Sequence, residues 1–128
     1  METLSGNVIV RASGIKGDKV VNTHGEDLGK IRETMIDIKE GKIAYAVLSV
    51  GGVLGLGDKL FAIPWDALRL DSINKCFVLN VNKSRLEEAQ GFDKDHWPQM
   101  ADSEWSQEIY NFFEHQPYGE KPEVRDDM

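Results

Sequence analysis

The chain contains a single cysteine, Cys76, so it cannot form an intramolecular disulfide, and nothing indicates an oxidising compartment. Residues 1–12 lack the continuous apolar run of a secretory signal, since Glu2, Asn7 and Arg11 interrupt it. No apolar run approaches the roughly 20 residues that a helix needs to cross a bilayer. We therefore expect a cytoplasmic protein without membrane insertion.

Basic charge becomes scarce towards the end of the chain. Residues 1–91 carry twelve acidic and twelve basic side chains, whereas residues 92–128 carry ten acidic and three basic ones, which accounts for the whole net charge of −7. An acidic extension repels phosphate backbones, so we expect no direct nucleic-acid binding. Two prolines and four acidic side chains follow Gln116, so residues 116–128 are expected to form a disordered acidic tail.

Residue patterns that carry chemistry are also sparse. The histidines His24, His96 and His115 lie far apart and lack the spacing of metal ligands. Cys76 begins an apolar segment, which favours a buried, inert thiol over a nucleophile. The aspartates near the predicted turns have no acid or base partner that the sequence reveals. We therefore predict a protein that is not an enzyme, with no catalytic residue, no bound metal and no cofactor.

A glycine-rich stretch at residues 51–59 invites comparison with phosphate-binding loops. Such a loop needs Gly-Lys-Ser/Thr at the start of a helix, so that backbone N–H groups face the anion. Here Asp58 separates Gly57 from Lys59, and strand-forming residues follow as far as Pro64. The stretch is better interpreted as a crossover with an apolar tip, which packs on the sheet or contacts a partner. The tip residues are Val53, Leu54 and Leu56.

β-branched and aromatic residues predict a mainly β core. Hairpin turns are expected at Asn22–Gly25 and at Glu40-Gly41, and residues 8–10 allow a further short strand. The segments expected to form strands are 19–22, 28–39, 42–50, 59–63, 69–71 and 76–81.

Two of these segments show more than simple alternation. In segment 28–39 the apolar residues fall on both parities, which predicts a bulge or bend of the kind that curls a sheet into a barrel. Segment 42–50 is also apolar on both parities, so both of its faces must be covered. One face would fill the barrel, and the other would meet either the C-terminal extension or a second copy of the chain.

Two helices are expected after the strands. The first spans residues 82–90, because Ser84 and Glu87 have capping-box spacing and Gly91 closes the helix. Asp102 is expected to cap the second, whose apolar stripe is interpreted as core or as a dimer seam rather than as a cofactor site. The stripe consists of Trp105, Ile109, Phe112 and Phe113.

Several short pieces between Val20 and Val81 occur in a specific order and spacing. They are Gly25–Ile31, Ile36-Asp37, Gly41–Ser49, Gly51-Gly52, Leu54–Trp65 and Phe77–Val81. This pattern resembles the PRC-barrel family, and the following segment 91–98 with its aromatic helix is similar to the stand-alone bacterial branch. Together with the predicted helices, the resemblance implies a small, strongly bent antiparallel β-barrel with a C-terminal α-helical extension.

We expect four parts along the chain. Residues 1–17 form a lead-in, and residues 18–82 form the barrel. Residues 83–115 form a helical extension that packs on the barrel or on a partner, and residues 116–128 form the acidic tail.

The resemblance also implies a general kind of role. The same module is similar to the cytoplasmic domain of the photosynthetic reaction-centre H subunit and to the C-terminal domain of a ribosome-maturation factor. In both it serves docking and scaffolding without a shared catalytic motif, so no family catalytic residue is carried over. The chain lacks the membrane helix of the first and the RNA-processing domain of the second, which leaves a general architectural or stress-related role.

The expected function is therefore a non-enzymatic interaction or scaffolding module that forms a homodimer or docks on an unidentified protein. The residues expected to make contact are Val53, Leu54, Leu56, Trp105, Ile109 and Phe112. One alternative is a small-molecule or enzymatic role with Asp58 and Lys59 as the polar groups. Another is an adaptor that acts on ribosomal or photosynthetic machinery.

Overall fold

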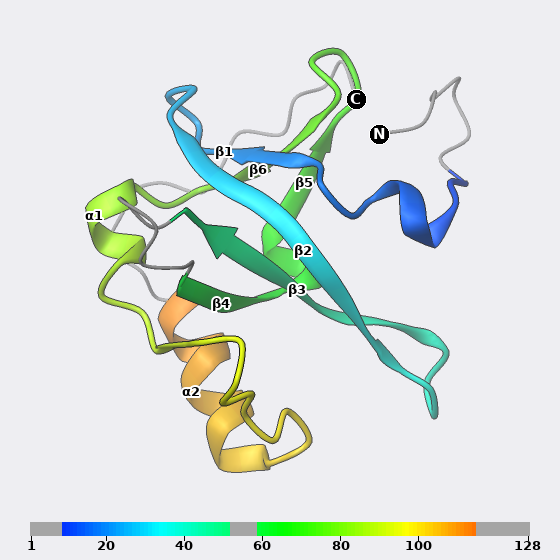
Figure 1. Ribbon diagram of the computed structural model, residues 1–128, viewed down its shortest axis with the longest axis vertical. Helices are drawn as coiled ribbons and strands as arrows, with labels where there is room; N and C mark the ends of the chain where they lie inside the picture. The colour runs from blue at the N-terminus through cyan, green and yellow to red at the C-terminus, as the bar shows by residue number, and fades with distance from the viewer. Residues whose placement is uncertain (1–8, 52–58, 115–128) are drawn as a thin grey trace.

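A single sheet of seven strands forms the centre of the structure, a computed structural model that describes residues 9–51 and 59–114 (Figure 1). The order of strands in the sheet is β5-β6-β1-β2-β3-β4-β7. The strands are β1 (Lys19–Val21), β2 (Asp27–Asp37), β3 (Lys42–Val50), β4 (Lys59–Pro64), β5 (Leu68–Asp71), β6 (Cys76–Leu79) and β7 (Gly91–Phe92). The helices are two 3₁₀ turns, η1 (Ala12–Gly14) and η2 (Trp65–Ala67), and two α-helices, α1 (Lys83–Leu86) and α2 (Ser103–Glu114).

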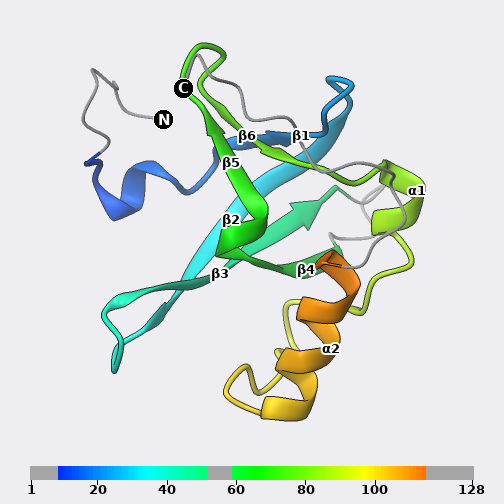
Figure 2. The same cartoon turned by 180° about the vertical axis from the view of Figure 1, so that it is seen from behind.

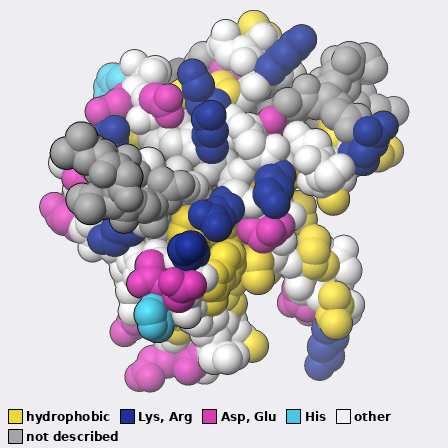
Figure 3. Space-filling model, viewed as in Figure 1, with side chains coloured by type: hydrophobic (Ala, Val, Ile, Leu, Met, Phe, Trp, Pro, Cys, Tyr) yellow, Lys and Arg dark blue, Asp and Glu magenta, His cyan; other side chains and the backbone are white. Residues whose placement is uncertain are grey.

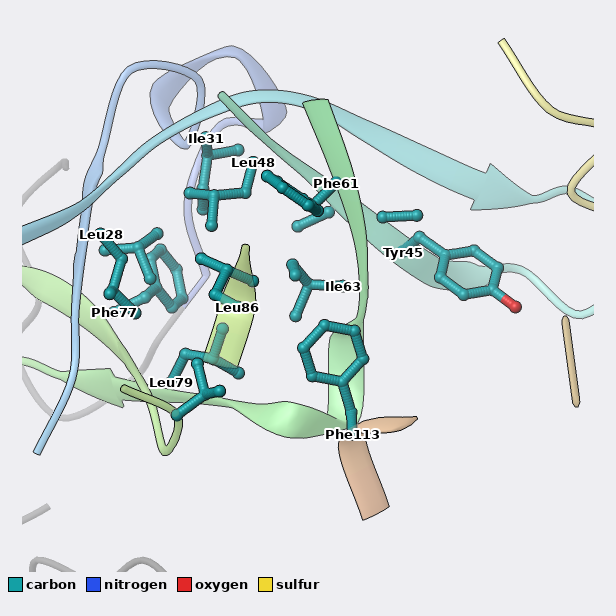
Figure 4. Close-up of a cluster of buried hydrophobic side chains, with 14 of the residues drawn as sticks. Leu28, Ile31, Tyr45, Leu48, Phe61, Ile63, Phe77, Leu79, Leu86 and Phe113 are labelled. Atoms are coloured by element: carbon teal, nitrogen blue, oxygen red, sulfur yellow. The ribbon is translucent and has the colours of Figure 1, made fainter. Parts of the chain in front are cut away.

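The predicted mainly β fold with a C-terminal helix is confirmed, with two corrections. The sheet is strongly curved but open, since its outer strands β5 and β7 do not pair with each other within the described ranges (Figures 1 and 2). The sheet is also not purely antiparallel, because β1 and β6 run parallel, with Val20 beside Phe77. Leu86 of α1 and Phe113 of α2 enter the same core as the strands (Figure 4), so helices help to enclose it.

The bend expected in segment 28–39 is present in β2. Its pairing with β3 shifts register twice, between Ile31 and Glu33 and again between Met35 and Ile36. The first shift leaves an extra residue, Arg32, in β2, and the second leaves an extra residue, Ala44, in β3. Ile31 is buried in the curve of the sheet, whereas Ile36, near the end of β2, is exposed.

Both faces of β3 are covered, as its double apolar parity predicted. Leu48 points into the curve of the sheet, where it pairs with Phe61 of β4. On the opposite face Tyr45 is also buried, and its ring lies 5.3 Å from the ring of Trp105 in α2. The Tyr45 hydroxyl donates a hydrogen bond of 3.0 Å to Ser106 Oγ. Of the two possible covers for this face, the structure therefore contains the C-terminal extension of the same chain.

The first predicted helix is wrong in length and in its cap. α1 covers only Lys83–Leu86, and Asn82 caps it by accepting the Arg85 N–H at 2.7 Å. The Ser84 hydroxyl donates to the same Asn82 oxygen, so it does not act as the cap. Gly91 does not close a helix but belongs to β7, where it pairs with Phe61.

The second helix, which carries the aromatic stripe, begins directly after its expected cap, Asp102. The Asp102 carboxylate accepts the N–H groups of Glu104 at 2.8 Å and Trp105 at 3.3 Å, which satisfies two N–H groups that have no partner within the helix. α2 lies beside β4 and contacts it (Figures 1 and 2). Its position next to β4 brings its aromatic stripe to the core.

The lead-in is attached to the sheet more closely than expected. No strand forms at residues 9–10, the described part of the short strand allowed there, and η1 follows instead. Ile15 is buried, and Gly17 N–H donates to Ile31 O at 2.7 Å while Ile31 N–H donates to Asp18 O at 2.9 Å. These bonds tie residues 15–18 to β2. The expected acidic tail at residues 116–128 lies outside the described residues.

Candidate interaction surface

The described residues offer little that resembles a chemical site. Within residues 9–51 and 59–114, no group of three or more His, Cys, Asp or Glu side chains is placed to hold a metal ion. Cys76 is buried at the start of β6. None of the helices in these ranges is both long and apolar enough to span a bilayer.

The contact residues predicted from the sequence fall into two groups. Val53, Leu54 and Leu56 lie outside the described residues, as does Asp58 of the alternative small-molecule site. The Nζ of Lys59, the other polar group of that alternative, lies 5.2 Å from the centroid of the Phe61 ring. Contact through the apolar residues of the glycine-rich stretch therefore stays a prediction, and so does the small-molecule alternative.

The second group lies together on α2, but its members face the chain's own sheet. Ile109 is only 2 % exposed and belongs to the core. Trp105 and Phe112 are half-buried, the former against Tyr45 and the latter beneath Arg85, whose guanidinium carbon lies 4.3 Å from the ring centroid. In this structure Ile109 is thus closed to a partner, and contact through Trp105 or Phe112 stays a prediction.

The largest projection from the sheet is the β2–β3 hairpin, which extends away from the remainder of the molecule (Figures 1 and 2). Ile36 is 51 % exposed and Ile38 is 90 % exposed, although both are large and aliphatic. Ile36 lies opposite Ile43 on β3, so an apolar surface runs from the strands to the turn. Figure 3 shows hydrophobic side chains, in yellow, along this projection.

The tip of the hairpin is held by its own hydrogen bonds. One Asp37 carboxylate oxygen accepts the N–H groups of Lys39 and Glu40, each at 3.0 Å. The Asp37 carbonyl also accepts the Gly41 N–H at 2.7 Å. A tip that is ordered before binding loses less conformational entropy when it meets a partner. The hairpin therefore presents Ile38 on a defined backbone.

The exposed isoleucines were missing from the contact residues predicted by sequence. Ile36 and Ile38 share the parity of Leu28, which is buried, so simple alternation places all three on one face. They differ from Leu28 in position along the sheet, because Ile36 lies near the end of β2 and Ile38 lies beyond it, on the projecting hairpin. The available signal was their place beside the predicted Glu40-Gly41 turn.

A second, smaller exposed feature lies between β7 and α2. The Trp97 ring packs 5.2 Å from the Phe92 ring and is 38 % exposed, and its Nε1–H donates to the Lys94 carbonyl at 2.9 Å. His96 Nδ1 and Asp93 Oδ1 share a hydrogen bond of 2.8 Å. This bond lowers the pKa of the Asp93 carboxyl and raises the pKa of the His96 imidazole.

The Asp93–His96 pair predicts a measurable titration. We expect an NMR titration to give His96 a pKa above 6.5, because its protonated ring bonds to the Asp93 carboxylate. The Asp93→Asn variant should bring this pKa back towards 6.5, whereas Asp95→Asn, which removes only a weaker charge effect, should change it less. Equal pKa values in wild type and Asp93→Asn would contradict the assigned bond.

The sign of the linked pH dependence follows from the two shifts. The raised His96 pKa stabilises the fold below pH 6.5, and this contribution is lost as the pH rises through the folded-state value. The lowered Asp93 pKa stabilises the fold above pH 3.8 and is lost as the pH falls through its folded-state value. The pair is therefore complete at mildly acidic pH. Its full exposure to solvent makes the effect on stability small.

Tyr110 of α2 also lies among aromatic side chains, and its surroundings change the pKa of its phenol. The Tyr110 ring lies 6.0 Å from the Tyr45 ring. Burial raises the pKa of the Tyr110 phenol, and the neighbouring Tyr45, Asp66 and Glu114 raise it further. Tyr110 therefore stays neutral at physiological pH and packs as an uncharged aromatic side chain.

A comparison with models of protein families gives a match. The sequence model of the PRC-barrel domain family matches residues 7–86, from before η1 to the end of α1. A search of curated proteins finds no match. The matched stretch includes the β2–β3 hairpin and excludes β7 and α2.

Proposed function

Because the chain belongs to the PRC-barrel domain family, we propose that it is a non-enzymatic protein-interaction module that associates with a second copy of itself. The family match supports a role in protein interaction. The observation that carries the proposal is the β2–β3 hairpin, which presents Ile36 and Ile38 to solvent on an ordered turn. Large aliphatic side chains gathered on a projecting element are typical of a contact surface.

A second copy suits this hairpin in charge as well as in hydrophobicity. The tip carries two acidic side chains, Asp37 and Glu40, and two basic ones, Lys39 and Lys42. In a two-fold dimer the same patch meets itself in the opposite direction. Such a meeting can set acid against base around the central isoleucines, which supports a second copy as the partner.

The expected affinity is modest. Two copies would bury four isoleucines, each worth about 1.5–3 kcal/mol when it passes fully from water to an apolar contact. Association costs about 4–15 kcal/mol in lost translational and rotational freedom, which offsets most of that gain. We therefore expect dimers at high micromolar to millimolar concentration, where the hairpin tips supply the contact.

The proposal predicts that the double variant Ile36→Thr/Ile38→Thr will associate at least tenfold more weakly than the wild type. Threonine retains the β-branched shape that a strand favours, so the fold should persist, while apolar surface is lost. The matched control is Ile73→Thr, since Ile73 is 62 % exposed on the β5–β6 turn and lies outside the hairpin. Sedimentation velocity over a concentration series measures the effect.

The control decides how the result is interpreted. Ile73→Thr should associate like the wild type, and all three proteins should unfold at the same urea concentration. A double variant that dimerises as tightly as the wild type would remove the hairpin as the contact surface.

A further inference from the structure

The hairpin half of β2 has an outer edge with no described strand beside it. On this side β1 pairs with β2 only before Ile31, and Ile31 itself bonds to Gly17 and Asp18 of the lead-in. Beyond Ile31, β3 is the only described strand that pairs with β2. Both ribbon views show this end of β2 beside β3 alone (Figures 1 and 2). We call residues 32–37 on this side the free edge of β2.

The register of β2 shows which backbone groups the free edge offers. Opposite residues in an antiparallel pair alternate between pairs that exchange hydrogen bonds and pairs that do not. Ile31 bonds away from β3, so its pair across to β3 exchanges none. Counted from there along the register, past the bulge, Met35 exchanges bonds with Tyr45. Its neighbours Thr34 and Ile36 therefore direct their N–H and carbonyl groups outward, to the free edge.

Pro64 supports this assignment from the other side of β3. It lies opposite Tyr45 and has no N–H to donate. No bond is lost there, because the N–H and carbonyl groups of Tyr45 already face β2. The outward groups of Thr34 and Ile36 thus have no ladder partner within the described residues.

Side chains along the free edge also suit a strand partner. Exposed edges are usually protected by charged side chains, by proline or by a covering element. Thr34, Met35 and Ile36 form a run without charge or proline, and Ile36 is 51 % exposed. A strand added here would pair with the outward groups and cover Ile36 at the same time.

We propose that two copies associate through their free edges, which pair antiparallel and continue the two sheets into one. This inference rests on the proposed self-association and adds backbone hydrogen bonds to the contact between isoleucines. A second copy suits the edge because it brings a free edge of the same length, with the same outward groups. In a two-fold pairing one residue lies opposite its own copy, and this residue fixes the register.

Three residues can occupy the centre, and two of them bring conflicts. A centre at Thr34 would carry the tip of the other hairpin beyond Ile31, where the lead-in occupies the edge. A centre at Met35 would set Glu33 opposite Asp37, and like charges directly opposite each other are destabilising.

A centre at Ile36 avoids both conflicts. The outward groups of Ile36 in the two copies then exchange two hydrogen bonds, and the two side chains lie opposite each other. Ile38 of each copy comes opposite Thr34 of the other, which keeps the isoleucines together. Lys39 comes opposite Glu33, so unlike charges meet at both ends of the contact.

Amide hydrogen exchange of the full chain tests the pairing in the wild type. The rate at Ile36 should fall as the concentration rises, in proportion to the fraction of monomer that remains, because the dimer bonds its N–H. The amide of Met35 is bonded within the monomer and should stay protected at every concentration, which makes it the internal control. An Ile36 rate that stays unchanged while the molar mass rises would overturn the pairing and leave the self-association standing.

The variants Ile36→Pro and Ile36→Val form a matched pair. Both reduce the apolar side chain by a similar amount, but only proline removes the N–H. Because that N–H faces outward, proline leaves the bonds of β2 to β3 in place, and the fold should persist. We expect Ile36→Pro to associate at least about tenfold more weakly than Ile36→Val in sedimentation velocity, since two central hydrogen bonds are lost. Equal association of the two variants would overturn the pairing.

The outcomes separate this inference from the proposed function. A wild type that stays monomeric overturns the self-association and the pairing together, and an extended segment of another protein then becomes the candidate for this edge. A urea series checks that Ile36→Pro folds, and if it does not, the exchange rate at Ile36 decides alone. Slower exchange in the dimer, together with weaker association of the proline variant than of the valine variant, supports the pairing.

Discussion

Replacing Gly29 by alanine is expected to destabilise the fold by about 2–6 kcal/mol. Gly29 has a φ of +141°, which side chains of L-residues rarely adopt, and a Cβ there would lie 2.3 Å from the Ser49 carbonyl oxygen. Backbone strain contributes about 1–3 kcal/mol and overlap with a neighbouring strand about the same again. A urea unfolding series at constant temperature measures the loss.

The matched control for this variant is Gly41→Ala. Gly41 also has a positive φ, +73°, but a Cβ there meets nothing within 4 Å. Only the strain remains, so we expect a loss of about 1–2 kcal/mol. Equal losses for the two variants would show that the close approach of β2 to β3 at Gly29 does not constrain the fold.

Replacing Ile109 by alanine is expected to cost about 2–5 kcal/mol, because the side chain is buried in the core with little room for collapse. The same helix supplies the control, since Glu108 is exposed and Glu108→Ala should change stability by less than about 0.5 kcal/mol. Urea unfolding monitored by tryptophan fluorescence reports both variants.

The loss of stability in Ile109→Ala can be measured at several protein concentrations. Its dependence on concentration shows whether Ile109 packs on its own sheet or on a second copy of the chain. If α2 packs on its own sheet in the monomer, the loss persists at low micromolar concentration. A loss that vanished on dilution would place Ile109 against a second copy only, and would contradict the packing of α2 within the monomer.

Local pattern predicted most of the strands but not their arrangement. The segment 42–50 coincides with β3, because a nearly continuous apolar run and Gly41 before it leave few alternatives. The parallel pairing of Val20 with Phe77 joins residues far apart in sequence, and no local pattern carries that information. The same holds for the open edge of the sheet, which depends on where the helices pack.

The helices show how competing local interactions decide a boundary. Ser84 and Glu87 have the spacing of a capping box, but Asn82 comes two residues earlier and its side chain accepts both the Arg85 N–H and the Ser84 hydroxyl. The helix therefore begins at Lys83, directly after this cap, and it ends at Leu86 instead of the predicted residue 90. For α2, by contrast, Asp102 was the available cap, and the predicted start is confirmed.

The candidate surface was less predictable than the fold. The apolar stripe that contains Trp105 and Ile109 predicted that one side of the helix is buried. The helical spacing of these residues does not reveal whether they pack on the same chain or on a second copy. Ile36 and Ile38 are exposed because they lie on the β2–β3 hairpin, beyond the core. How far a hairpin extends beyond the core depends on the arrangement of the whole sheet, which a local pattern does not reveal.

The molar mass of the wild-type chain, measured by light scattering over a concentration series, tests the proposed self-association most directly. We expect a mass that rises from 14.4 kDa towards twice that value as the concentration approaches the millimolar range. A mass that stays at 14.4 kDa throughout the series would contradict it.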